Sequence, residues 1–204
     1  PLTAMRTAIE VTLLRRDRTP EQLEEMANQV KRSVERAEAT IEALLTLATS
    51  EVSSSAGELL DLATAAEDAL DANQSAISAR NLTIDAALEP APTRGDRVLL
   101  ERMVANLVDN AVRHNNAGGW IGIRTRRHDG NTLLEIANTG ADIRSEQIPT
   151  LFEPFARINQ RVGSEDGAGL GLSIADAIGR AHAATITARP RPEGGLEIAV
   201  TVPD

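Results

Sequence analysis

The stretch that decides the fold is Asp166-Gly167-Ala168-Gly169-Leu170-Gly171-Leu172-Ser173. Three glycines stand at alternate positions, and the segment behind them is amphipathic to about Ala184. Because glycine has no Cβ, the main chain of such a loop can pass close to a ligand. The free N–H groups and the positive dipole end of the following helix favour an anion, usually a phosphate. The stretch predicts a phosphate-binding loop that feeds a helix, although a glycine-rich loop alone also fits a plain turn.

A second motif lies upstream and reads Asn106-Leu107-Val108-Asp109-Asn110-Ala111-Val112-Arg113-His114. It belongs to a predicted helix, because apolar residues recur at spacings of three and four. These apolar residues are Leu99, Leu100, Met103, Val104, Leu107 and Ala111. Asn106 and Asn110 share a face, and their amide oxygens could hold a Mg²⁺ ion that also holds phosphate oxygens. The alternative is an ordinary solvated polar face.

Four motifs in this order resemble the ATP-binding catalytic domain of sensor histidine kinases, whose boxes are called N, G1, F and G2. The second motif resembles the N box, and the glycine-rich stretch resembles the G2 box. Between them, Asn138-Thr139-Gly140-Ala141-Asp142 resembles the G1 box. Leu151-Phe152-Glu153-Pro154-Phe155-Ala156-Arg157 resembles the F box. Together the four motifs extend over residues 106–173, about a third of the chain, and they imply a site for ATP and Mg²⁺.

The resemblance also implies which residues form that site. The catalytic residues would be Asn106, Asn110, Arg113 and Arg157, with Asn110 and Asn106 at the metal. The nucleotide contacts would come from Asn106, Asn110, Arg113, His114, Asn138, Gly140, Gly167, Gly169, Leu170, Gly171 and Leu172. Glu153–Gly167 resembles the family's mobile lid, with Phe152 and Phe155 as apolar anchors at its base. We expect slow hydrolysis, because Asn106 cannot take a proton at neutral pH where related ATPases carry a glutamate.

The G1 box departs from the family at two places. Asn138 stands where an aspartate usually accepts a hydrogen bond from the adenine amino group, and Ala141-Asp142 replaces the second glycine. The amide oxygen of Asn138 can still accept this bond, but without charge assistance it is weaker. These departures motivate an alternative function, a degenerate module that dimerises and binds partners with little or no nucleotide affinity.

The amino-terminal residues Pro1-Leu2-Thr3-Ala4-Met5 resemble the end of the family's phosphoacceptor motif. The phosphorylated histidine of that motif lies five positions before the proline, so we expect the acceptor upstream of Pro1. The histidines present, His114, His128 and His182, stand in no such motif. We therefore expect this sequence to bind nucleotide without phosphorylating itself.

Residues 1–52 are predicted to form a helical hairpin. One apolar stripe comprises Leu2, Met5, Ile9 and Leu13, and the other Leu23, Met26, Val30, Val34, Ala37, Ile41, Leu44 and Ala48. Thr19-Pro20-Glu21-Gln22 between them supplies the elements of a capping box. Docking with a second copy would bury both stripes in a four-helix bundle. The alternative is a hairpin that packs on its own globular domain.

Residues 53–204 are predicted to form the catalytic domain. The expected strands are Glu58–Leu62, Leu82–Ala87, Trp120–Arg126, Thr132–Ala137, Thr185–Ala188 and Leu196–Val202. Hairpin turns are expected at Asp129-Gly130-Asn131 and around Glu193-Gly194-Gly195. Ala63–Arg80 and Leu170–Ala184 are expected helices, and Pro90–Arg94 an expected loop. The predicted fold class is α+β: a two-helix hairpin followed by a Bergerat-type α/β sandwich, with helices on one face of a mixed sheet.

Composition narrows the function further. The net charge of −9 argues against a nucleic-acid-binding surface, and a sequence without cysteine excludes disulfide and thiolate chemistry in these residues. No apolar run approaches membrane-spanning length. The family implies a homodimer, a response-regulator partner, and the cytoplasmic portion of a membrane-anchored bacterial sensor. An anti-sigma serine kinase shares the ATP domain but lacks the leading hairpin.

Overall fold

A computed structural model describes residues 2–14, 19–31, 33–34, 57–156 and 169–203. The described residues leave out residues 35–52 of the predicted hairpin and residues 157–167 of the predicted lid, among them Arg157 and Gly167.

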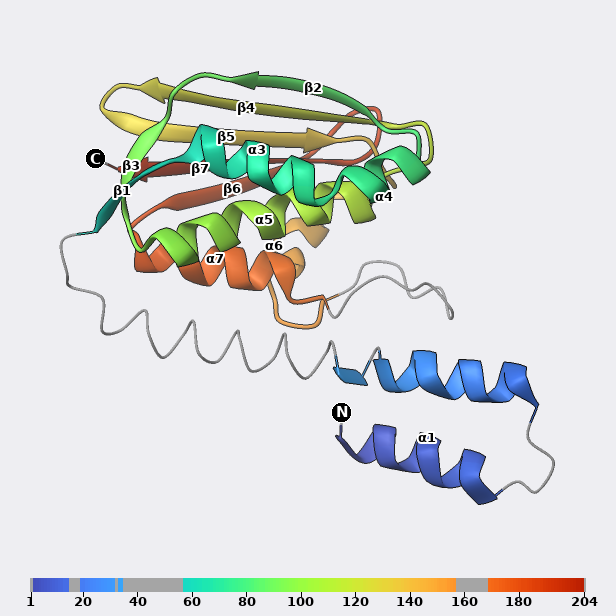
Figure 1. Cartoon of the computed structure of the whole chain (residues 1–204). Helices are drawn as coiled ribbons and strands as arrows, with labels where there is room; N and C mark the ends of the chain where they lie inside the picture. Colours follow the sequence, from blue (N-terminus) through green and yellow to red (C-terminus); the bar gives the residue numbers. More distant parts are fainter. Residues whose placement is uncertain (1, 15–18, 32, 35–56, 157–168, 204) are drawn as a thin grey trace.

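A five-stranded sheet forms one layer of the fold (Figure 1). Its strands, in spatial order, are β2 (Thr83–Leu88), β4 (Trp120–His128), β5 (Asn131–Asn138), β7 (Leu196–Pro203) and β6 (Thr185–Pro190). Strands β2 and β4 are parallel, because a helix connects them, and the other neighbours are antiparallel. The predicted mixed sheet is confirmed.

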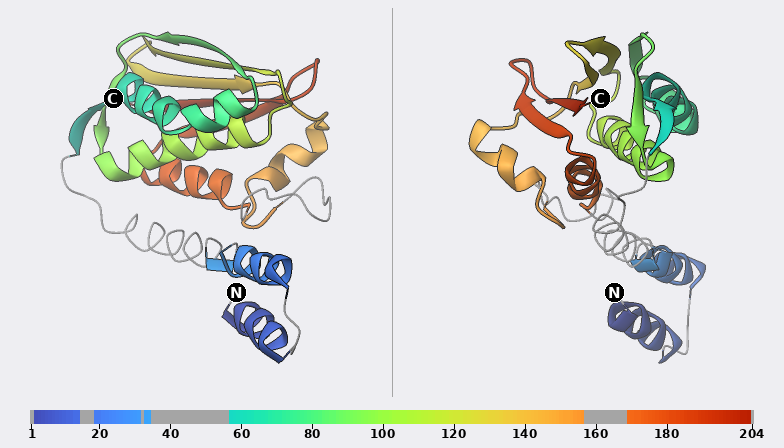
Figure 2. Two further views of the ribbon diagram at one scale, coloured as in Figure 1. Left: turned by 45° about the vertical axis from the view of Figure 1, so that its right-hand side comes forward. Right: turned by 90° about the vertical axis from the view of Figure 1, so that its left-hand side faces the viewer.

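Three helices cover one face of this sheet: α3 (Leu62–Ala72), α5 (Arg97–Arg113) and α7 (Gly171–Ala181) (Figure 2). The core between the layers is aliphatic. Its largest fully buried side chains include Leu62, Leu100, Met103, Leu107, Ile121, Ile123, Leu134 and Ile178. The predicted apolar stripe of α5 is buried except for Leu99, which is half-buried. The predicted layering, with helices on one face, is confirmed.

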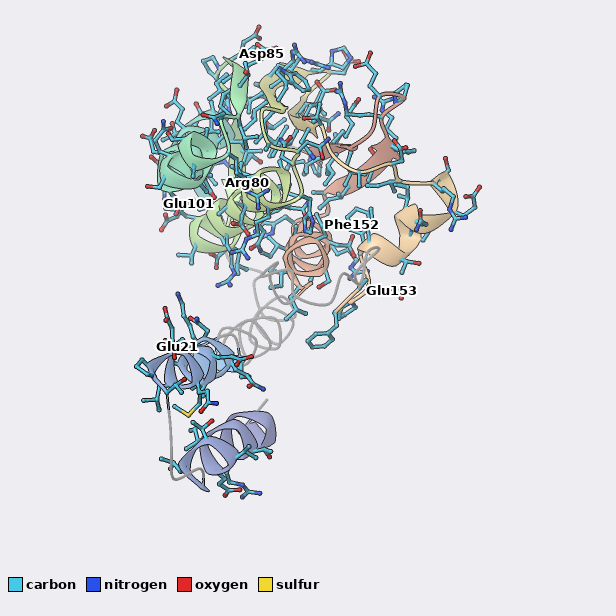
Figure 3. All side chains as sticks on the ribbon, turned by 90° about the vertical axis from the view of Figure 1, so that its right-hand side faces the viewer. Glu21, Arg80, Asp85, Glu101, Phe152 and Glu153 are labelled. Carbon is cyan, nitrogen blue, oxygen red and sulfur yellow. The ribbon has the colours of Figure 1, made fainter. Side chains whose placement is uncertain are left out.

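The other face of the sheet carries ion pairs between neighbouring strands. Arg124 pairs with Asp85 at 3.3 Å, and Arg126 pairs with Glu135 at 2.8 Å. Figure 3 places Asp85 at the edge of the sheet away from the helices. Such exposed pairs contribute at most about 1 kcal/mol each. Their charge shows that this face is in contact with water, so the core lies on the helix side alone.

Two predicted turns are confirmed by their backbone geometry. Asp129 and Gly130 have φ values of 50° and 77° between the paired residues His128 and Asn131, as a type I′ hairpin turn requires. Residues 194 and 195, both glycines, have φ values of 84° and 97° and lead into β7.

The segment Ala63–Arg80 is not one helix, as predicted, but two. Helix α3 ends at Ala72 and α4 (Gln74–Ala79) begins after Asn73. The Nδ2 group of Asn73 donates to the carbonyl of Ala69 at 3.0 Å, which ends α3. Because asparagine competes with the helix for its own carbonyls, an alanine-rich run can break there.

The predicted loop Pro90–Arg94 contains a strand, which is a second correction. Strand β3 (Pro92–Gly95) pairs antiparallel with β1 (Glu58–Asp61) in a separate two-stranded sheet. The Asp61 carboxylate accepts hydrogen bonds from the N–H groups of Ala63 and Ala91, each at 2.9 Å. One side chain thus caps α3 and holds the start of β3 beside β1, which a local sequence pattern does not reveal.

The amino-terminal region contains α1 (Leu2–Leu14) and a helix that begins at Pro20. The N–H of Gln22 donates to the Thr19 hydroxyl at 3.4 Å, and the N–H of Thr19 donates to Oε1 of Gln22 at 3.5 Å. The predicted capping box is therefore confirmed. Several apolar side chains of these helices are exposed, namely Ile9, Val11, Leu13, Leu23 and Val34. In the described part of the chain, no helix is long and apolar enough to span a membrane.

Candidate functional site

Helices α5 and α7 lie side by side and run in opposite directions. Asp96 is the N-cap of α5, and its N–H donates to Nε2 of His182, the C-cap of α7, at 3.0 Å. At the other end, Gly171 begins α7 against the middle of α5. A Cβ built on Gly171 would lie 3.7 Å from the carbonyl oxygen of Asn106. The structure therefore brings the predicted N and G2 motifs together.

The start of α7 presents main-chain donors. Among the described residues no side chain caps this helix, and the hydroxyl of Ser173 donates to the carbonyl of Leu170 at 2.9 Å. The first N–H groups of a helix have no partner within it. Leu170 and Leu172 are 3% and 7% exposed, main chain included, so both residues belong to the core. A contact from these two predicted residues to a ligand would come from their main-chain N–H groups, which suit an anion.

Asn106 presents a polar group that the fold leaves unsatisfied. Its Nδ2 atom is buried and has no hydrogen-bond partner among the described residues. Leaving such a donor unpaired costs about 1–3 kcal/mol, so a ligand that accepts from it would recover this energy. Asn110 lies one turn further along α5 and is also half-buried. These two amides are the predicted metal ligands, and the main-chain oxygen and Cβ of Asn106 lie next to Gly171.

Arg113, in the last turn of α5, has a partner in the structure. Its Nε lies 2.7 Å from a carboxylate oxygen of Asp109, and the two side chains are 45% and 41% exposed. This i,i+4 pair lies along the helix surface. The side chain of His114, the C-cap of the same helix, is exposed. Both predicted residues therefore lie at the carboxyl end of α5, beside the asparagines.

The predicted G1 motif reaches the same end of α5. Asn138 is the last residue of β5 and is 4% exposed, and its Nδ2 donates to the carbonyl of Thr139 at 2.8 Å. Its Oδ1 is thereby left as an acceptor. A Cβ on Gly140 would lie 2.6 Å from the carbonyl oxygen of His114, so only glycine fits there. The close approach brings the end of β5 against the end of α5.

The described ends of the predicted lid also meet. The N–H of Phe155 donates to the carbonyl of Gly169 at 2.9 Å. Gly169 has a φ of +70°, and a Cβ on it would lie 2.8 Å from the carbonyl oxygen of Ala156. The F and G2 motifs are thus in direct contact. Arg157 and Gly167 remain predictions, because they lie outside the described residues.

The prediction for the two phenylalanines is half wrong. Phe152 is half-buried and packs against the core, on the α6 (Ile148–Leu151) side of the site in Figure 3. Phe155 is 57% exposed, so its ring anchors nothing in the described part of the chain. Its main chain is in the left-handed region with a φ of 66° and is fixed by the bond to Gly169. The direction of the Phe155 ring is therefore set by the conformation of its main chain. It is not set by packing of the ring in the core.

Sequence reasoning missed Asn115, which lies directly after α5. This residue is 8% exposed, and its Oδ1 accepts a hydrogen bond from the Thr139 hydroxyl at 2.7 Å. The sequence signal was a polar residue before the pair Gly118-Gly119, which indicates a turn. A turn signal does not reveal a partner 24 residues away.

The chain is similar to known proteins in sequence and in fold. Residues 95–204 match the family described as histidine kinase-, DNA gyrase B-, and HSP90-like ATPase. Sensor protein CutS of Streptomyces coelicolor is 39% identical over 205 residues, which cover 100% of this chain and 49% of CutS. The chain thus spans about half the length of these curated relatives.

Solved structures share the fold. The mycobacterial sensor histidine kinase MprB matches with a TM-score of 0.64 and 26% identity over 72% of this chain and 97% of MprB. Histidine kinase ThkA, solved in complex with response regulator protein TrrA, matches with a TM-score of 0.72 over 100% of this chain and 57% of ThkA. Its 21% identity supports the fold alone. The family match covers more than half of the chain, so the chain belongs to the histidine kinase-, DNA gyrase B-, and HSP90-like ATPase family, as the catalytic domain of a sensor histidine kinase.

Proposed function

We propose that this chain binds Mg-ATP where α5, the start of α7 and the end of β5 meet, and that it transfers the γ-phosphoryl group to a histidine. The observation that carries the proposal is the buried, unpartnered Nδ2 of Asn106 beside the glycine that begins α7. A phosphate oxygen would satisfy this donor and the free N–H groups of α7 together.

Each half of the nucleotide has a matching group. For the base, Oδ1 of Asn138 would accept a hydrogen bond from the adenine amino group, since its Nδ2 is used by Thr139. For the phosphates, the main chain at Gly169, Leu170, Gly171 and Leu172 would donate, and the fork of Arg113 would bind a phosphate oxygen. Gly140 and His114, whose main chains approach closely, would lie between the base-binding and the phosphate-binding parts of the site.

The amide oxygens of Asn106 and Asn110 would hold Mg²⁺ together with phosphate oxygens, which suits an ion that takes few protein ligands. When bound, the ion would neutralise charge on the transferred group. Asn106 cannot act as a general base, so it would position the phosphates without activating water. We propose that this residue keeps the γ-phosphoryl group for a histidine acceptor. Arg157 would reach the γ-phosphate, and Gly167 would complete the loop.

We further propose that residues 1–52 form a dimerisation hairpin with the acceptor histidine upstream, and that residues 53–204 form the catalytic domain. The exposed apolar residues Ile9, Leu13 and Leu23 support a four-helix bundle with a second copy. A response regulator would receive the phosphoryl group, as the complex of the related ThkA with TrrA suggests by analogy. The coverage of CutS supports a role as the cytoplasmic portion of a longer sensor.

A second function, dimerisation and partner binding without useful nucleotide affinity, is favoured by Asn138 and by the exposed carboxylate of Asp142 in the G1 motif. Calorimetric titration with Mg-ATP and Mg-ADP separates the two. We expect binding that Asn106→Ala weakens about tenfold, the loss expected for one charge-assisted hydrogen bond. Asn131→Ala, in the distant β4–β5 turn, is the control. No detectable heat at millimolar nucleotide would favour the second function.

A further inference from the structure

A hydrogen-bond network around the buried Asn115 joins the loop after α5 to the turn after β5. The Nδ2 of Asn115 donates to the carbonyl of Ala111 at 3.3 Å and to that of Trp120 at 3.1 Å. Its Oδ1 accepts from the hydroxyl of Thr139 at 2.7 Å. Both donor hydrogens and the acceptor of this buried amide are therefore used, which orders the side chain.

Thr139 is equally committed. Its hydroxyl oxygen accepts from the N–H of Trp120 at 2.8 Å while the hydroxyl donates to Asn115. Its own N–H donates to the carbonyl of Trp120 at 3.0 Å. A Cβ on Gly119 would collide with both Asn115 and Thr139, so the network fills the space that this glycine leaves. A valine at position 139 would keep the shape of the threonine and lose both hydroxyl bonds.

The network spans the two halves of the proposed site. On one side, α5 carries Asn110 and Arg113 immediately before Asn115. On the other side, Thr139 stands between Asn138 and Gly140. Arg80 adds a third attachment, since its Nη1 donates to the carbonyl of Asn115 at 3.2 Å.

We propose that Asn115 and Thr139 are positioning residues that hold the base-binding end of β5 at a fixed separation from the phosphate-binding end of α5. The inference rests on the proposed function and deepens it. Neither side chain contacts the nucleotide, because both are used within the network. Asn115 and Thr139 would affect nucleotide affinity indirectly. They would do so by positioning Asn138 at the base and Asn110 and Arg113 at the phosphates.

A positioning role predicts that the affinities for Mg-ATP and for adenosine change by different amounts. ATP occupies both halves of the site, so its affinity depends on how well their separation is fixed. Adenosine occupies the base half alone and does not sense that separation. Loss of the network should therefore weaken Mg-ATP binding and leave adenosine binding almost unchanged. Simple loosening of the Asn138 turn would weaken both ligands alike.

The experiment compares four variants of the full chain: Thr139→Val, Thr139→Ser, Asn115→Ala and Asn73→Ala. The last is the matched control, because Asn73 makes the same i to i−4 amide bond at the end of α3, away from the site. Circular dichroism and urea unfolding first establish that each variant is folded at the working temperature. Calorimetry then measures the Kd of Mg-ATP, and ligand-observed NMR measures that of adenosine.

We expect Thr139→Val and Asn115→Ala each to raise the Kd of Mg-ATP about tenfold and that of adenosine less than about twofold, in keeping with the loss of one fixed connection. Thr139→Ser and Asn73→Ala should stay near the wild-type values for both ligands. The Asn115→Ala/Thr139→Val double variant should be little worse than either single variant, because both remove the same connection.

Two results would overturn the inference: an unchanged Kd of Mg-ATP in folded Thr139→Val and Asn115→Ala, or equal losses for adenosine and Mg-ATP. Should Thr139→Val unfold, Asn115→Gln replaces it, because this change keeps the amide and displaces it by one methylene group. The same expectations apply. A wild-type chain that binds adenosine and Mg-ATP equally weakly would overturn the proposed function, and this inference with it.

Discussion

Gly171 at the start of α7 lies within van der Waals range of Asn106 on α5: a Cβ on the glycine would stand 3.7 Å from the Asn106 carbonyl oxygen and 4.0 Å from its Cβ. These are ordinary contact distances, so the fold itself can accept a methyl group at this position. Packing therefore does not require glycine at this position. We infer that glycine leaves space for a ligand next to Asn106.

Gly171→Ala separates folding from binding. We expect the free energy of unfolding to stay the same or to rise by up to about 1 kcal/mol, because alanine favours the helix over glycine. The affinity for Mg-ATP should fall, because the methyl group would stand where the phosphates approach. Urea unfolding and calorimetric titration of one preparation check both. A variant that keeps wild-type affinity would remove Gly171 from the phosphate site.

Gly140→Ala should behave in the opposite way and destabilise the fold. Its Cβ would lie 2.6 Å from the carbonyl oxygen of His114, so backbone must shift, at a cost of about 1–3 kcal/mol. Gly118→Ala is the control, since no atom lies within 4 Å of its Cβ and only its φ of +70° is unfavourable, at about 1 kcal/mol. Equal losses in urea unfolding would contradict the close approach.

Asn110→Ala removes one proposed magnesium ligand from the face of α5 without touching the base pocket. The affinity for Mg-ATP should fall about tenfold, as outer and inner ligands of metal sites commonly show when removed. Binding of adenosine should be unaffected, which makes it the internal control. Calorimetry with and without Mg²⁺ measures the difference. If the variant retains the full magnesium dependence, Asn110 is not a metal ligand.

His182→Ala tests the far end of the helix pair. The Nε2 of His182 accepts from the N–H of Asp96 at 3.0 Å, and its Nδ1 lies 2.8 Å from the carbonyl oxygen of Ile178. Losing these bonds should lower the free energy of unfolding by about 1–2 kcal/mol. Because this contact lies at the opposite end of α7 from Gly171, the Kd of Mg-ATP should not change. A large rise in that Kd would show that the two ends are coupled.

Thr19→Ala should change a carboxyl titration at the start of the second helix. A hydrogen bond from the Thr19 side chain, with a smaller backbone contribution, lowers the pKa of Glu21 below its ordinary value. Because the folded pKa is the lower one, this interaction stabilises the helix start above the ordinary pKa and is lost as the pH falls through the lowered one. In the variant the pKa should rise toward the ordinary value, which NMR titration of the side chain measures.

Local patterns predicted the parts of the fold that depend on neighbouring residues. The Asp129-Gly130 turn and the buried face of α5 were predictable because turn chemistry and helical spacing act over a few residues. The end of α3 at Asn73 and strand β3 were not predictable. Strand β3 depends on Asp61, which bonds to Ala91 from 30 positions away.

The same distinction applies to the site. Motif order located Asn106, Asn138 and Gly171, because these residues occupy recognisable positions in the sequence. It did not indicate that Thr139 donates to Asn115, since nothing local to either residue specifies the other. Nor did it reveal that Phe155 would be exposed, because its direction follows from a backbone bond across the predicted lid.

The two neighbouring helices differ in length, with 17 residues in α5 and 11 in α7. From Asn106, where α7 begins beside it, α5 continues for about two more turns, roughly 10 Å at 1.5 Å per residue. Were α7 to start two turns earlier, its side chains would lie along this overhang and bury Asn110 in a helix–helix contact. The late start of α7 thus leaves Asn110 half-buried, while Ala111 and Val112 on the other face of the same turn stay in the core.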